Sequence, residues 1–307
     1  MKKKIIDRKY FDQFQMPIVI NTEMFEIFTQ SDFDELVEVV RRCNVVKLFI
    51  NHQQPFSLGK KILRFSPNQL EMIIDEVPKI KIALDCLAFT EENIEEFCKI
   101  ISKKKNCELY MHIQKLYYLF SIKDIELMAK YDIKLTELSS YYLKIFSAED
   151  DYSLQRLCEA LAKMKHLKSF EFYFRHVPTL IDHFIKLPIT WLSTGYFDIS
   201  GKDKIEKVVH TLSQIKSLRY LYIDHWNYKL EPEDLAMFKE LPVKSIDIVS
   251  LHLTNENIPE FRRIISGMNV EGIHSLDSDE FEELNINVEA HGLGGMYKTL
   301  CTFKSGK

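Results

Sequence analysis

A thirteen-residue segment occurs twice in the chain. TEENIEEFCKIIS begins at Thr90 and TNENIPEFRRIIS begins at Thr254, and nine of their thirteen positions are identical. In the first copy Asn93 and Glu96 have the spacing of a capping box, the second copy repeats it, and apolar residues at helical spacing follow. Each copy is therefore predicted to be a short amphipathic helix with one apolar face to cover.

The two helices are each followed by a short β-like segment, NCELYMHI after the first copy and VEGIHSL after the second. A unit of helix, turn and strand cannot bury its own apolar face, so copies of the unit must stack. Phe97 and Phe261 occupy the same position in the two copies. They are predicted to be equivalent core residues that pack their helices onto a sheet.

Further copies of the unit lie between these two. LCEALAKMKHLKSFEFYF from Leu157 superposes on VVHTLSQIKSLRYLYIDH from Val208 with an offset of 51, and LPITWLST from Leu187 superposes on LPVKSIDI from Leu241 with an offset of 54. The pattern apolar-x-x-apolar-x-apolar then predicts strands whose first apolar residues, here called strand anchors, recur about every 28 residues. The nine strand anchors are Val45, Val77, Asn106, Leu135, Leu167, Ile189, Leu218, Val243 and Val270, of which Asn106 departs from the apolar pattern.

These segments resemble leucine-rich repeats, and their period with a helix in every unit is similar to the ribonuclease-inhibitor-like subtype. The resemblance implies an α/β solenoid of about nine irregular repeats, with a parallel concave β-sheet and helices on the convex side. The chain departs from the repeat consensus where Arg175 and Trp226 stand in place of Asn or Cys. The expected domains are an N-terminal cap at 1–30, the solenoid at 31–280, and a C-terminal cap and tail at 281–307.

Composition narrows the function classes. The 307 residues are 46% apolar and 28% charged with a net charge of −4, which indicates a folded protein with no overall attraction to nucleic acid. We see neither a secretory signal nor an apolar stretch of membrane-spanning length, and the six cysteines form no CxxC pair. We therefore expect a cytoplasmic protein, with a nuclear location as the alternative, that has free thiols and no membrane contact.

Catalytic signatures are not found in the sequence. It contains no HExxH, Walker A or GxSxG motif, and its histidines and carboxylates lack the spacing of metal ligands. The glycine-rich stretch HGLGGMYK from His291 does not follow the strand-to-helix pattern of a phosphate loop and is expected to be a C-terminal loop. We expect neither enzymatic activity nor a cofactor.

Strand residues that alternate with the apolar anchors are expected to face the concave surface. Aromatic residues are frequent at these positions, and such residues bury large areas at protein interfaces. Lysines lie in the early units and carboxylates in the later ones, so we expect a protein partner with a basic surface. The residues predicted to contact it are Tyr110, Tyr141, Glu171, Tyr173, Trp191, Tyr220, Tyr222, Asp224 and Asp247.

The leading hypothesis is a non-catalytic interaction scaffold that binds a macromolecule, first of all a protein, through the concave face. Three alternatives stay open, and the resemblance implies the first two. One is a substrate-recognition subunit of a ubiquitin ligase, although the stretch from Met16 leaves too little room for a full F-box. Another is a GTPase-activating protein of the leucine-rich-repeat type, although the asparagine-rich loop positions of that family are lacking. The third is a ribonucleoprotein-bound factor, which the net acidity disfavours.

Overall fold

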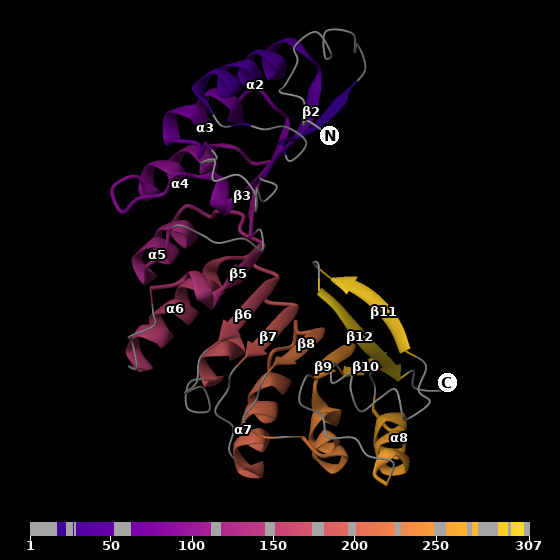
Figure 1. Ribbon diagram of the computed structural model, residues 1–307. Helices are drawn as coiled ribbons and strands as arrows, with labels where there is room; N and C mark the ends of the chain where they lie inside the picture. Colours follow the sequence, from indigo (N-terminus) through magenta and orange to yellow (C-terminus); the bar gives the residue numbers. More distant parts are fainter. Residues whose placement is uncertain are drawn as a thin grey trace. The chain divides into compact units, whose positions relative to one another are not determined.

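The chain forms two compact units (Figure 1). One unit comprises Met1–Leu138 with Lys163–His166, and the other comprises Ser139–Ala162 with Leu167–Lys307. The computed structural model describes residues 17–22, 27, 29–51, 63–111, 118–144, 151–173, 181–195, 201–224, 228, 230–248, 256–268, 272–275, 288–293 and 296–303.

The first unit is a four-stranded sheet with helices on one side (Figure 1). The strands are stacked in chain order, β1-β2-β3-β4, and every pairing between them is parallel. An isolated parallel bridge from Leu109 to Leu135 continues the stack beyond β4. The elements are β1 (Ile18–Asn21), α2 (Gln30–Arg42), β2 (Val45–Ile50), α3 (Pro67–Ile74), β3 (Lys79–Ala83), η2 (Leu84–Cys86), α4 (Ile94–Lys103), β4 (Cys107–Tyr110) and α5 (Ile122–Lys130).

The second unit is built on an eight-stranded sheet with the order β11-β12-β10-β9-β8-β7-β6-β5. Strands β6 to β10 pair in parallel, whereas β12 pairs antiparallel with both β10 and β11. The elements are β5 (Glu137–Ser139) at the division between the units, η3 (Ser140–Tyr142), α6 (Asp151–Lys163), β6 (Ser169–Tyr173), η5 (Ile181–Lys186), β7 (Trp191–Gly195), α7 (Lys202–Ser213), β8 (Tyr220–Asp224), η6 (Pro232–Glu240), β9 (Ser245–Ile248), α8 (Ile258–Ser266), β10 (Gly272–Ser275), β11 (Val288–Leu293) and β12 (Met296–Phe303).

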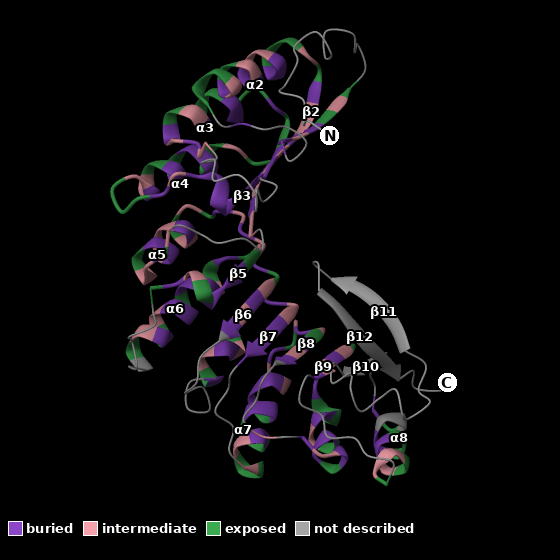
Figure 2. Ribbon diagram, in the orientation of Figure 1, coloured by how far each residue is buried: buried purple, intermediate pink, exposed green. Residues whose placement is uncertain are grey.

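The strand anchors form the core between each sheet and its helices, as the buried strand segments in Figure 2 show. The predicted positions are confirmed by burial of Val45, Val77, Leu167, Ile189, Leu218 and Val243. Leu135 is also 0% exposed, but it pairs with Leu109, where the prediction placed Leu138, so the register predicted there is wrong. Val270 lies outside the described residues.

The anchor predicted at Asn106 is wrong. Asn106 is exposed, and Cys107 is the residue that pairs with buried Ile80 in β3. The prediction placed this strand two residues out of register, because it aligned Leu109 with Ile80 instead of with Ile82. A shift of two leaves every side chain on its original face, so Tyr110 keeps the predicted orientation.

Helical connectors of two kinds alternate in the second unit. The register joins Ser169, Trp191, Tyr220, Ser245 and Gly272 in one row. The 3₁₀ segment η5 connects β6 to β7, and η6 connects β8 to β9. The α-helix α7 connects β7 to β8, and α8 connects β9 to β10; these two connections are longer in sequence. The offsets of 51 and 54 seen in the sequence are therefore the length of one α unit plus one 3₁₀ unit.

The start of α4 lacks the side-chain cap that was predicted at Asn93. This residue precedes α4 but makes no side-chain cap. Its Oδ1 accepts a hydrogen bond from the Thr90 N–H at 2.8 Å, and its Nδ2 donates to the Ala88 carbonyl at 2.8 Å, so it braces the preceding turn. Capping boxes do form at α2, α3, α5 and η6.

The α/β class and the stacking of parallel strands with helices on one side are confirmed. The ribonuclease-inhibitor-like subtype, the repeat number and the domain limits 1–30, 31–280 and 281–307 stay predictions. At the C-terminus, the loop predicted at HGLGGMYK is wrong, because His291 lies in β11 and Met296 to Lys298 lie in β12.

The equivalence of Phe97 and Phe261 generates a stability prediction. Both side chains are 0% exposed, and the Phe97 ring packs edge-on against Phe89 with centroids 4.9 Å apart. Replacing either phenylalanine with alanine is expected to lower the free energy of unfolding of its own unit by about 3–5 kcal/mol. Chemical denaturation measures the loss, with exposed Lys99→Ala and Arg262→Ala as controls that should change it by less than about 0.5 kcal/mol. A loss below about 1 kcal/mol for either phenylalanine would contradict the assigned core.

Candidate binding face

The open face of each sheet is the face turned away from the helices. In the second unit, parallel strands in register bring open-face residues together in rows that cross the sheet. The middle row consists of Glu171, Ser193, Tyr222 and Asp247 on β6 to β9, and it continues to His274 on β10. Neighbouring strands are about 4.8 Å apart, so each residue of the row lies directly beside the next.

A second row carries two large aromatic side chains. It consists of Ser169, Trp191, Tyr220 and Ser245, and it lies two residues before the middle row on each strand. Tyr220 is 45% exposed and Trp191 is half-buried. With Tyr222 in the middle row, three rings lie on the two adjacent strands β7 and β8, which makes this the aromatic part of the face.

Ser193 is a polar group that the fold does not use. Its side chain is 1% exposed, and its hydroxyl has no hydrogen-bond partner in the described part of the chain. The register places it on the open face, between the longer residues Glu171 and Tyr222. An unsatisfied buried hydroxyl costs stability, so the middle of the row is polar without benefit to folding.

Asp247 is the second such group. Its carboxylate makes no hydrogen bond or ion pair with any residue in the described ranges, and burial raises the pKa of the Asp247 carboxyl to about 6. Desolvation disfavours the charged form of an acid. At neutral pH the second unit therefore holds a partly buried negative charge beside the tyrosines of β8.

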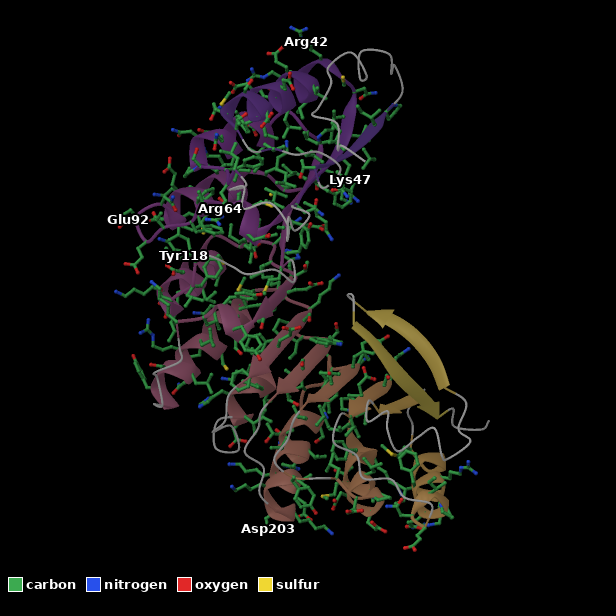
Figure 3. The ribbon with its side chains drawn as sticks, in the orientation of Figure 1. Arg42, Lys47, Arg64, Glu92, Tyr118 and Asp203 are labelled. Atoms are coloured by element: carbon green, nitrogen blue, oxygen red, sulfur yellow. The ribbon has the colours of Figure 1, made fainter. Side chains whose placement is uncertain are left out.

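The open face of the first unit has a different chemistry. Lys47 projects from β2 away from the helices, with its Nζ 4.3 Å from the centroid of the Phe49 ring (Figure 3). Lys81 on β3 lies with its Nζ 3.7 Å from Glu108 and 5.4 Å from the centroid of the Tyr110 ring. Lysine and aromatic side chains thus pair with each other on this sheet.

The structure brings most of the predicted contact residues into the second unit. Glu171, Trp191, Tyr220, Tyr222 and Asp247 share one open face, as predicted from strand alternation. Tyr173 and Asp224 occupy the ends of β6 and β8, and their side chains lie outside the described residues.

Two predicted contact residues lie elsewhere. Tyr110 belongs to β4 of the first unit. Tyr141 is 45% exposed but lies in η3 instead of a strand, where its N–H donates to the Ser139 hydroxyl at 3.4 Å. Strand alternation already predicts that Ser193 faces outward, but the sequence does not show that its hydroxyl lacks a partner among the described residues.

Among the residues that the structure describes, no group of three or more His, Cys, Asp or Glu side chains could hold a metal ion. Cys98 and Cys107 are buried, and desolvation raises the pKa of each thiol to about 12. Such thiols stay protonated and are poor nucleophiles. No helix within the described ranges is long and apolar enough to cross a membrane.

Comparison with known proteins gives distant structural likenesses. The sequence matches no protein-family model and no curated protein. An internalin (inlF) from Listeria monocytogenes is 12% identical with a TM-score of 0.36, over 81% of this chain and 78% of that chain. TLR13 in its complex with ssRNA13 is 11% identical with a TM-score of 0.39, over 83% of this chain but only 43% of that chain. Mouse RP105 in its complex with MD-1 is 12% identical with a TM-score of 0.32, over 84% of this chain and 34% of that chain. The fold assignment therefore depends on the strand order and burial in this chain.

The buried carboxyl generates a prediction with a defined pH dependence. The folded-state pKa of Asp247 lies above its ordinary value of 3.8, so the folded state binds more protons than the unfolded state between about pH 4 and 6. The free energy of unfolding contributed by this group therefore falls as pH rises through that range. Asp247→Asn is expected to stabilise the second unit by up to about 3 kcal/mol at pH 7.5 and by little near pH 4. Urea denaturation at both pH values measures this, and a variant less stable than the wild type at pH 7.5 would contradict it.

Proposed function

We propose that the protein is a non-catalytic interaction scaffold that binds a protein partner with a basic surface through the open face of the second unit. One observation carries the proposal: half-buried and exposed aromatic rings lie beside two polar groups, Ser193 and Asp247, that the fold leaves without hydrogen-bond partners among the described residues.

The composition of the face supports a protein partner. Tyrosine and tryptophan bury large areas when they bind and lose little conformational entropy, which is why they dominate the energetics of protein interfaces. Trp191, Tyr220 and Tyr222 are adjacent across β7 and β8. The carboxylates of Glu171 and Asp247 lie in the row beside them, and their negative charge favours a partner that presents arginine or lysine.

The identity of the partner distinguishes the three alternative functions that the sequence analysis left open. A ligase core, a GTPase or ribosomal material captured by this face would identify the protein as a substrate-recognition subunit, a GTPase-activating protein or a ribonucleoprotein-bound factor, respectively.

Affinity capture with matched variants tests the proposal. Trp191→Ala and Tyr220→Ala are expected to weaken binding of a captured partner by more than tenfold, because aromatic side chains at an interface centre typically cost about 2 kcal/mol or more when truncated. Tyr152→Ala is the matched control, since Tyr152 is 67% exposed on α6 in the same unit. Arg262→Ala tests α8 and should also leave binding unchanged. If Tyr152→Ala or Arg262→Ala abolishes capture and the two open-face variants do not, the proposed face is wrong.

A further inference from the structure

Resting on the proposed function, we infer that Tyr220, Tyr222 and Asp247 form a subsite that receives one arginine side chain of the partner. The inference names a contact within the open face, and it goes beyond a basic partner because it distinguishes arginine from lysine and assigns the residues that make the distinction.

The register gives the geometry of the subsite. Tyr222 on β8 lies directly opposite Asp247 on β9, and Tyr220 lies opposite Ser245, two residues earlier on both strands. Tyr220 is thus the diagonal neighbour of Asp247, at about 7–8 Å between Cα atoms. Because all three residues lie on the open face, the carboxylate and the two tyrosine side chains are neighbours on it.

Such an arrangement suits a guanidinium better than an ammonium. A guanidinium is planar, stacks on an aromatic face within about 6 Å of the ring centroid, and can donate two parallel hydrogen bonds to one carboxylate. A lysine ammonium is a compact and strongly hydrated point charge that gains less from stacking. Tyr220 is 45% exposed, so its ring is accessible to a side chain arriving from solvent.

The second argument is the unpaired charge. Asp247 has no cationic partner in the described part of the chain, and burial is the cause of its pKa of about 6. A guanidinium would supply the missing counter-charge and favour the ionised carboxyl. Binding is therefore coupled to loss of the Asp247 proton: affinity is full well above pH 6 and is lost as pH falls through 6.

Other titratable residues occupy neighbouring positions of the sheet. Tyr222 is the register partner of Asp247 on β8 and His274 is its register partner on β10, while Glu171 lies three strands away in the middle row. The contribution of Asp247 is therefore obtained as the difference between the wild type and Asp247→Asn.

The probe is a fluorescein-labelled nona-arginine peptide, titrated with the full chain at pH 7.5 and followed by fluorescence anisotropy. Nona-citrulline is the uncharged control, and nona-lysine is the control for charge alone. We expect nona-arginine to bind at least threefold more tightly than nona-lysine and nona-citrulline not to bind. Asp247→Asn is expected to weaken nona-arginine binding about tenfold, and Tyr220→Ala to remove the preference for arginine over lysine.

Matched variants separate the subsite from diffuse charge attraction. Glu206→Gln removes the same charge from an exposed position on α7, and it should change the affinity less than twofold. Between pH 7.5 and pH 5 the wild-type affinity should fall by up to about tenfold, the change in the ionised fraction of a group whose pKa is about 6. The same pH change should alter the affinity of Asp247→Asn less than twofold and should still weaken binding by His274→Gln.

The outcomes separate this inference from the proposed function. Equal losses for Asp247→Asn and Glu206→Gln, or equal affinity for the arginine and lysine peptides, would overturn the subsite. If Trp191→Ala abolishes partner capture while Asp247→Asn affects neither capture nor nona-arginine binding, the scaffold function stands and the subsite is wrong. If neither Trp191→Ala nor Tyr220→Ala affects capture, the proposed binding face itself is wrong.

Discussion

Register between parallel strands is the constraint on which the remaining structure depends. A single helix and strand cannot bury an apolar face, so each unit is stable only beside a neighbour whose strand residues fall at the same level. Leu192, Leu221 and Ile246 show the result, since they pair across β7, β8 and β9 and are at most 1% exposed. Because side chains alternate along a strand, the same pairing places Ser193, Tyr222 and Asp247 side by side on the other face. Core packing and the composition of the candidate binding face are thus two consequences of one alignment.

The sequence predicts the parts of the structure that depend on this alternation. Seven of the nine strand anchors are buried where they were predicted. Apolar residues that follow one another after three and then two positions fit few other kinds of secondary structure. The anchor at Asn106 failed because alternation alone does not distinguish a register from one shifted by two residues. The strand position predicted for Tyr141 is wrong for a local reason, because Ser139 ends β5 and its hydroxyl caps the η3 turn. The isolation of the Ser193 hydroxyl could not be predicted, since it depends on which neighbours the pairing places beside it.

Stability and binding make opposite demands on the middle row. An asparagine at position 247, or an apolar residue at 193, would serve folding better than the residues present, because neither the Asp247 charge nor the Ser193 hydroxyl is compensated within the described part of the second unit. The open face of the first unit differs in this respect, since Lys81 is 3.7 Å from Glu108 and Lys47 lies over the Phe49 ring. Groups retained at a cost to folding are typical of surfaces whose counterpart lies on another molecule.

The alternation of α and 3₁₀ connectors has a consequence for how the second unit can grow. An α-helix with its side chains is about 10–12 Å wide, whereas the strands beneath are about 4.8 Å apart, and a 3₁₀ segment is the tighter of the two helices. The repeating segment of this region is therefore a pair of units, and its length is the offset at which the sequence superposes on itself. A duplication of one such pair keeps a narrow connector beside every wide one. A duplication of about half that length would place two connectors of the same kind side by side, as α3 and α4 lie in the first unit, and would therefore end the alternation of connectors in this sheet.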